Sequence, residues 1–371
     1  MEVDIALILF VAFAVTACIQ LCYYWGIFSR TLAKVTKPDG PVQSASVIIC
    51  ARNNRSFLEA NLPAVLSQDH PDFEVIVVND GSTDGTIDFL DNLEREHNKL
   101  KVLHLDIDER FHRGKKFAQT IGIKAAKHDV LVFTDADCKP ASSQWLKMMS
   151  QSMTKDKSIV LGVGNYQRKL SLTNWIIQLE TFHSLLLYIN FSLAKKTYMG
   201  VGRNLSYRRE LFFSVKGFAS HQHLLSGDDD LFVNETATKT NTAVCLASDG
   251  FTISEPKMNL SQWMRQKKRH YSTGKMYKFK HRFALGLYAF SLLFYYILGV
   301  LTIVDQSFLI PALGIVGFRF ITQAIILFRN MKVFGYLKYY WVFPFLDIGI
   351  LLIHIFVGVR GYFSKPLRWN Y

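Results

Sequence analysis

A short apolar run that ends on two acidic residues reads Val130-Leu131-Val132-Phe133-Thr134-Asp135-Ala136-Asp137. Before it, three other β-branched runs alternate with helix-like segments, which is typical of βαβ units and a parallel sheet. We therefore predict an α/β fold with strands at Ser46–Cys50, Glu74–Val78, Lys101–Leu105 and Val130–Thr134, and helices at Phe57–Ser67, Thr86–His97 and Lys115–Lys127. Such sheets bind ligands at the carboxyl ends of their strands, where polar residues of this chain fall.

The two acids after the fourth strand, Asp135 and Asp137, are candidate metal ligands. Mg²⁺ and Mn²⁺ prefer oxygen ligands of this kind and complete their coordination shell with phosphates. An isolated Asp-x-Asp tripeptide is more often a plain turn. Its position after a fourth parallel strand favours a site for Mg²⁺ or Mn²⁺ and a phosphate-bearing ligand.

A second polar turn follows the apolar run Val75–Val78 and reads Asn79-Asp80-Gly81-Ser82-Thr83-Asp84-Gly85-Thr86. Asp80 at the strand tip can accept hydrogen bonds from a base or a ribose. Ser82 or Thr83 can cap the helix that follows. Capping and turn formation alone would also explain this composition, and both interpretations can hold together.

These motifs resemble those of the family two glycosyltransferases with the GT-A fold, a group that holds cellulose, chitin and hyaluronan synthases and dolichol- or undecaprenyl-linked sugar transferases. Six shared motifs run in the family's order across residues 44–274. They are Ala51-Arg52-Asn53-Asn54, Asn79–Asp84, Arg113-Gly114-Lys115, Thr134–Asp137, Gly202-Arg203-Asn204 and Gly227-Asp228-Asp229-Asp230-Leu231. The order of all six carries the resemblance, because each motif alone is weak.

The resemblance implies an inverting, metal-dependent transfer from a nucleotide-sugar donor, a UDP- or GDP-sugar. It assigns the nucleobase to Asp80, the nucleotide to Arg52 and Lys115, and the ribose and metal to Asp135 and Asp137. The Gly-Asp-Asp box would supply the catalytic base, which we place on Asp229 with Asp228 beside it, because one carboxylate must take the proton of the acceptor hydroxyl. A solvated helix start is the alternative for these acids.

The segment Arg265–Tyr271 corresponds to the Gln-x-x-Arg-Trp motif of the membrane-bound branch. Gln266 and Arg269 match it, share one helix face and could reach the diphosphate. His270 stands where the family has Trp, which argues against processive polymerisation. Together with Gly202 and Asn204, we expect His270 to contact the acceptor.

Two segments are expected to lie on the membrane surface as interfacial helices, at about 172–194 and 260–272. The first repeats apolar residues near helical spacing, and an ordinary buried helix is the alternative. The second is basic and amphipathic, with Trp263, Met264 and Tyr271 expected to face lipid.

Four apolar stretches are long enough to span a bilayer: Ile5–Phe28, Phe283–Val304, Phe308–Phe328 and Tyr340–Val359. Acids precede the first and basic residues follow it, so the positive-inside rule places the next domain in the cytosol. A cleaved signal peptide and a lipoprotein box at Val15–Cys18 are less favoured alternatives. Four simple spans would leave Arg360, Lys365 and Arg368 outside, which conflicts with that rule unless one segment is re-entrant or interfacial.

The expected organisation is therefore an anchor at 1–30, a linker at 31–43, a cytosolic GT-A catalytic domain at 44–280 and a membrane region at 281–371. The net charge is +13, but Lys and Arg cluster beside apolar runs, which favours an anionic membrane face over nucleic acid. Five cysteines without a CxxC pair indicate reduced thiols.

The preferred function is transfer of one sugar to a lipid-linked or glycan acceptor by an integral membrane protein, expected in a bacterial inner membrane. A processive polysaccharide synthase is one alternative. A non-catalytic membrane scaffold on a transferase fold is another, and intact Asp135, Asp137 and Asp229 argue against it.

Overall fold

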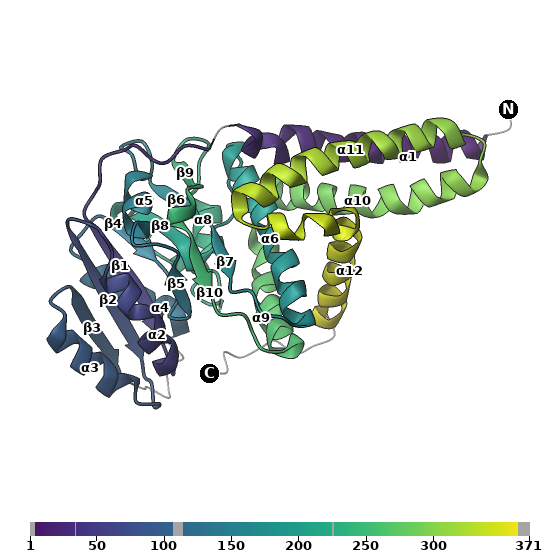
Figure 1. Cartoon of the computed structure of the whole chain (residues 1–371). Helices are drawn as coiled ribbons and strands as arrows, with labels where there is room; N and C mark the ends of the chain where they lie inside the picture. The colour runs from purple at the N-terminus through teal and green to yellow at the C-terminus, as the bar shows by residue number, and fades with distance from the viewer. Residues whose placement is uncertain (1–3, 34, 107–113, 225, 363–371) are drawn as a thin grey trace.

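The computed structural model joins a mixed α/β domain to a set of long helices (Figure 1). The structure describes residues 4–33, 35–106, 114–224 and 226–362, with side chains as far as residue 357. The α/β domain contains a seven-stranded sheet in the order β3-β2-β1-β4-β8-β6-β9. Its strands are β1 (Ala45–Ala51), β2 (Phe73–Asp80), β3 (Leu100–Leu105), β4 (Val130–Phe133), β6 (Ile159–Gly162), β8 (Leu205–Arg208) and β9 (Thr242–Cys245).

The first four strands are parallel, as the sequence predicts. Strand β8 runs antiparallel to both β4 and β6, so the sheet is mixed in its second half. Alternate residues of β1 are buried on opposite faces, since Val47 and Ile49 belong to one core cluster and Ile48 to another. Helices therefore cover both faces, which is typical of an α/β domain.

The helices of the domain begin and end close to the predicted positions. The crossovers of the parallel half are α2 (Arg55–Leu66), α3 (Thr86–Glu96) and α4 (Gly114–Ala125), and α5 (Trp145–Gln151), α7 (Arg209–Ser214) and α8 (Asp230–Thr236) follow later. A small second sheet in the order β5-β10-β7 contains β5 (Cys138–Pro140), β7 (Gly164–Tyr166) and β10 (Thr252–Ser254). Because β5 begins directly after Asp137, this sheet fixes the far side of the acidic turn.

Helix α6 (Leu172–Leu193) lies at the junction between the α/β domain and the long helices (Figure 1). The sequence pattern predicts a face that lies on lipid, but Phe182, Leu186 and Ile189 are buried in the protein core, and Trp175 and Leu179 pack against that core. The prediction that these side chains face lipid is therefore wrong, and the alternative of an ordinary buried helix is correct for them. Apolar periodicity does not distinguish the two cases because lipid and protein interiors are both apolar.

Three long helices run beside one another away from the α/β domain (Figure 1). They are α1 (Ile5–Gly26), α10 (Phe279–Asp305) and α11 (Leu309–Phe334). With the segment Leu337–Val357, they make four segments that are long and apolar enough to cross a membrane. The predicted positions of the apolar segments, one near the amino terminus and three after the α/β domain, are confirmed.

The fourth apolar segment has a different direction. It comprises the 3₁₀ turn Leu337–Val342 and helix α12 (Phe343–Tyr362), which runs across the three-helix bundle and beside α6 and α9 (Leu260–Thr273) (Figure 1). This crosswise direction is compatible with the interfacial alternative for this segment.

The charged residue inside the third span, Arg319, is buried among the bundle helices. Its guanidinium donates to Asp347 Oδ2 at 2.6 Å, to Gln20 Oε1 at 3.2 Å and to Gln323 Oε1 at 3.2 Å. Tyr295 presents its ring 4.4 Å away. This group, the Arg319 cluster, ties α1, α11 and α12 together, as expected for a charge that faces protein within a span.

Candidate active site

The acidic turn after β4 provides two carboxylates that could hold a cation. Oxygen atoms of Asp135 and Asp137 and the thiol of Cys138 lie within 4.8 Å of one another. The thiol exchanges a hydrogen bond with Ser254 Oγ at 2.9 Å, and burial raises its pKa well above the usual range. A protonated, buried thiol is a poor ligand, so the two carboxylates are the donors that fit Mg²⁺ or Mn²⁺.

Lys115, in the first turn of α4, connects this turn with the Gly-Asp-Asp box. Its ammonium lies 2.8 Å from Asp135 Oδ1 and 3.0 Å from Asp228 Oδ2. Burial alone would lower the pKa of Lys115, but these carboxylates raise it well above its usual value. Lys115 is therefore charged and holds together two motifs 93 residues apart in the sequence (135 to 228). We call Lys115, Asp135 and Asp228 the Lys115 cluster.

Asp229 lies beside this cluster at the start of α8. The backbone N–H of Gly202 donates to its Oδ2 at 2.7 Å, and the N–H of Asp230 donates to its Oδ1 at 2.7 Å. Burial raises the pKa of Asp229 to about 7, and the charges of Asp228 and Asp230 add to this effect. A carboxylate with such a pKa, oriented by two fixed donors, has the properties of a general base near neutral pH.

Asp230 has a different environment. Its Oδ2 accepts hydrogen bonds from Tyr277 Oη at 2.8 Å and from the hydroxyl of Thr273. These two hydroxyls come from the end of α9 and the turn after it, so Asp230 attaches the Gly-Asp-Asp box to the helices. No motif singles out Tyr277 or Thr273 in the sequence.

The edge formed by β1 and β2 carries Arg52 and Asp80. The charges of Asp80, Asp135, Asp228 and Lys115 all act on the thiol of Cys50, so these groups gather at one edge of the sheet as expected. The capping prediction at this edge is wrong, because Asp84 accepts the N–H of Thr86 at 3.2 Å, whereas Ser82 Oγ accepts the N–H of Asn53 at 2.9 Å. Arg113 lies outside the described residues.

Arg203 is a site residue that the sequence interpretation did not single out. Its guanidinium lies 4.2 Å from the ring centre of Tyr166. Although burial raises the pKa of Asp135, Lys115 lowers it, and Arg203 and Arg269 contribute to this lowering. Arg269 therefore lies near the acidic turn, as the family motif implies. Its motif partner Gln266 donates to Tyr166 Oη at 3.4 Å.

Asn204 and helix α9 have surroundings that the sequence did not indicate. Asn204 is buried, and its side chain bonds Trp145 Nε1 at 3.0 Å and the carbonyls of Val163 and Gly250 at 2.9 and 2.8 Å. Helix α9 also does not present Trp263 and Met264 to lipid. Both are buried in a cluster with Tyr166, Ile177 and Val357.

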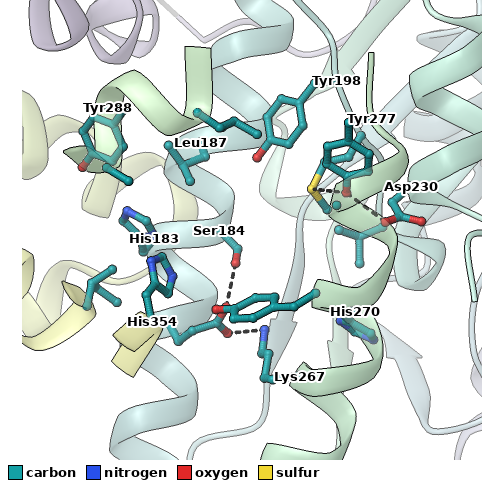
Figure 2. Close-up of a pocket in the computed structure, with 18 of the residues that line it drawn as sticks. His183, Ser184, Leu187, Tyr198, Asp230, Lys267, His270, Tyr277, Tyr288 and His354 are labelled. Atoms are coloured by element: carbon teal, nitrogen blue, oxygen red, sulfur yellow. Dashed lines mark hydrogen bonds and ion pairs between the residues drawn. The ribbon is translucent and has the colours of Figure 1, made fainter. Parts of the chain in front are cut away.

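A cavity of about 410 Å³ lies beside Asp229 and is lined by His270, Tyr271 and residues of α6, α10 and α12. Figure 2 shows His183, Ser184, Lys267 and His270 around it, with Asp230 and Tyr277 on one side and Tyr288 and His354 on the other. His270 therefore lines the same cavity as Asp229. Gly202 contacts the same carboxylate through its backbone, and an added Cβ would lie 3.3 Å from Asp229 Oδ2.

Residues 46–214 match the family model described as "Glycosyl transferase family 2". The poly-beta-1,6-N-acetyl-D-glucosamine synthase of Staphylococcus epidermidis is 31% identical over 119 residues, which are 31% of this chain and 27% of that protein. Glycosyltransferase AglE of Haloferax volcanii is 28% identical over 207 residues, which are 55% of this chain and 64% of that protein. The match thus spans less than two thirds of either relative.

Among solved structures, the mannosyltransferase PcManGT from Pyrobaculum calidifontis, in complex with GDP-Man and Mn²⁺, superposes with a TM-score of 0.59 at 17% identity. The superposition covers 97% of this chain and 99% of that one. Together with the sheet and its helices, this likeness confirms the predicted GT-A fold. The resemblance is also confirmed over residues 46–214, which contain five of the six motifs.

Proposed function

We propose, from the premise that residues 46–214 form a glycosyl transferase family 2 domain, that the protein transfers a sugar from a nucleotide-sugar to an acceptor at a membrane. The observation that carries the proposal is the Lys115 cluster. Its lysine joins Asp135 of the acidic turn to Asp228, the chain neighbour of Asp229. Donor-binding and proton-accepting groups thereby share one site.

The donor is a UDP- or GDP-sugar under this proposal. The structural neighbour PcManGT is in complex with GDP-Man and Mn²⁺, and this chain has two oxygen ligands at its own acidic turn. Asp135 and Asp137 would hold Mg²⁺ or Mn²⁺, which supplies charge neutralisation for the departing diphosphate. Arg269 and Gln266 lie on the side of the site where the diphosphate would be, and Asp80 with Arg52 flank the nucleoside.

The transfer follows from the environment of Asp229. Its Oδ atoms, held by the N–H groups of Gly202 and Asp230, take the proton of an acceptor hydroxyl. The hydroxyl oxygen then forms a bond to the anomeric carbon while the bond from that carbon to the diphosphate breaks. Attack opposite the leaving group inverts the anomeric centre. Lys115 offsets negative charge during this step.

A membrane-facing acceptor is supported by the cavity beside Asp229, since α10 and α12 form part of its wall. A lipid-linked or glycan acceptor fits this location. The charge pattern around the first span supports a cytosolic catalytic domain in an inner membrane. Addition of one sugar is favoured over processive synthesis because His270, and not a tryptophan, lines the cavity next to Asp229.

The proposal is tested with purified full-length protein, Mn²⁺ or Mg²⁺ and a panel of sugar nucleotides, by measuring the release of free nucleoside diphosphate. Membranes then supply acceptors, and the products are extracted into organic solvent and sized. We expect one donor to give a lipid-soluble product that bears one added sugar. High-molecular-mass glycan made without other proteins would favour the processive alternative. Failure to bind or turn over any donor would favour the scaffold.

A further inference from the structure

The cavity beside Asp229 has a lining of polar and apolar residues. Asp229, Asp230 and Ser226 contribute to it, and so do Leu292 of α10 and Ile350 of α12. In Figure 2, Asp230 and Tyr277 lie on one side of the cavity, and Tyr288 and His354 lie on the other. Its volume of about 410 Å³ lies within the usual range of small-molecule sites. A molecule with a polar head and an apolar chain matches this lining.

The charges of the cavity do not favour an anionic head. Among its described lining residues Lys267 is the one lysine or arginine, and it forms an ion pair with Glu180. Ser184 Oγ donates to the same carboxylate at 2.9 Å. The remaining charged groups are the carboxyls of Asp229 and Asp230. A phosphate bound here would lie near these carboxylates, and the described lining offers it no lysine or arginine that is not already paired. Burial of an unpaired charge is costly.

His183, which lies beside Tyr288 and His354 (Figure 2), is a suitable partner for a neutral polar group of the ligand. This residue of α6 is 3% exposed, lines the cavity, and its Nε2 makes no hydrogen bond within the described part of the chain. Burial lowers the pKa of His183 well below its usual value, so the imidazole is neutral. A neutral imidazole can accept or donate a hydrogen bond, which suits a hydroxyl.

The chemistry of Asp229 favours the same conclusion. A hydroxyl acceptor must lose its proton as its oxygen bonds to the anomeric carbon, and Asp229 can receive that proton. A phosphate monoester is already ionised near neutral pH, so its oxygen attacks without a base. A positioned carboxylate with a pKa of about 7 is therefore useful only for the first kind of acceptor.

We infer that the cavity between Asp229 and helices α10 and α12 binds a lipid whose reacting head is a neutral hydroxyl, such as a glycolipid, and not a lipid phosphate. Its reacting head lies beside Asp229, and its apolar chain lies against Leu292 and Ile350. Lys267 and Glu180 are positioning residues that hold the wall of α6 against α9. This inference rests on the proposed function and adds the class of acceptor to it.

The test uses the full-length protein in lipid nanodiscs with the donor that supports nucleoside diphosphate release. Three acceptors are compared: a long-chain alkyl glycoside, an alkyl phosphate of the same chain length, and a methyl glycoside. We expect the long-chain glycoside to be glycosylated with a kcat/KM at least about tenfold above that of either other compound. Equal or better use of the alkyl phosphate would overturn the inference.

Matched variants on α10 locate the lipid. Leu292→Trp fills the cavity and should raise the KM for the long-chain glycoside about tenfold or more, whereas Leu301→Trp, at a position 47% exposed on the outside of the same helix, should leave it unchanged. If Leu292→Trp does not fold, the Tm of the wild-type protein is measured with each ligand instead. The alkyl glycoside should raise this Tm more than the alkyl phosphate does. An equal shift would count against the inference.

The two levels of proposal fail differently. If the protein binds a donor and glycosylates the methyl glycoside as well as the long-chain one, the lipid site is wrong and the transferase function stands. If no donor binds and no acceptor is modified, the transferase function itself is wrong.

Discussion

Two groups of buried charges in this molecule are built in opposite ways. In the Lys115 cluster one lysine lies between two carboxylates, and its side chain stays 24% exposed. In the Arg319 cluster one arginine meets one aspartate, and both side chains are nearly sealed, at 3% and 4% exposure. Beside the first group, Asp229 lines a cavity and has a pKa that burial raises, while the charges of the second group are paired within it. The difference suggests that the first group serves chemistry and the second holds helices together.

The largest expected effect concerns the metal. Asp137→Ala removes one of two carboxylate ligands at the acidic turn, so transfer should fall to background while the fold is retained. Chelator should have the same effect on the wild-type protein, and Mn²⁺ or Mg²⁺ should restore activity. Nucleoside diphosphate release measures turnover, and circular dichroism checks the fold. Full activity in excess EDTA would contradict the metal role.

The next effect separates the acids of the Gly-Asp-Asp box. Asp229→Asn should lower the rate of transfer by roughly 10²–10⁴-fold, the usual contribution of a positioned base, while donor binding persists in calorimetry. Asp228→Asn is the matched comparison, since Asp228 is the ion-pair partner of Lys115. If Asp228→Asn is the inactive variant and Asp229→Asn is not, the assignment within the box is wrong.

Breaking the Arg319 cluster should act on stability. Arg319→Met leaves Asp347 buried without its partner, which should lower the free energy of unfolding by about 3–5 kcal/mol. The double variant Arg319→Met/Asp347→Leu removes both charges and should recover most of that loss. Thermal unfolding in nanodiscs measures both. A single variant as stable as the wild type would show that this ion pair does not hold the bundle.

The smallest effect is on pH dependence. The pKa of Asp229 is raised to about 7 from 3.8, so the base is lost as the pH falls below about 7, and kcat/KM should fall about tenfold per unit there. In the folded protein the carboxyl binds its proton more tightly than in the unfolded chain. The stability that its protonation contributes is therefore fully present below pH 3.8 and is lost as the pH rises to about 7. An acidic limb near pH 4 would contradict this environment.

Much of the α/β domain could be predicted because its signals are local. The apolar runs Val75–Val78 and Val130–Phe133 form strands that pair in parallel with β1. The acidic turns after them therefore lie at the same edge of the sheet, where parallel strands end. Lys115 and Asp229 were identified through motifs, but their environment depends on contacts between distant segments. The pKa of Asp229 arises from burial, which no short stretch of sequence encodes.

The surroundings of a side chain could not be predicted without knowledge of its partners. Phe182 of α6 and Trp263 of α9 are apolar at helical spacing, and the sequence does not say whether lipid or protein covers them. Asn204 was expected to contact the acceptor because it belongs to the motif Gly202-Arg203-Asn204. Its three hydrogen bonds, to Trp145, Val163 and Gly250, come from remote parts of the chain. Polarity in a motif therefore predicts a binding role only when the side chain is not already used by the fold.

One paired measurement tests the distinction between the two charge groups most directly. Asp229→Asn and Asp347→Asn are the same change, one beside the Lys115 cluster and one in the Arg319 cluster, and sugar transfer and Tm are measured for both proteins in nanodiscs. The expected result is that Asp229→Asn lowers transfer by roughly 10²–10⁴-fold without lowering the Tm, and that Asp347→Asn lowers the Tm while the folded protein still transfers sugar. Retained transfer in Asp229→Asn, or its loss only together with a lowered Tm, would contradict the assignment of Asp229 as the base of a glycosyltransferase.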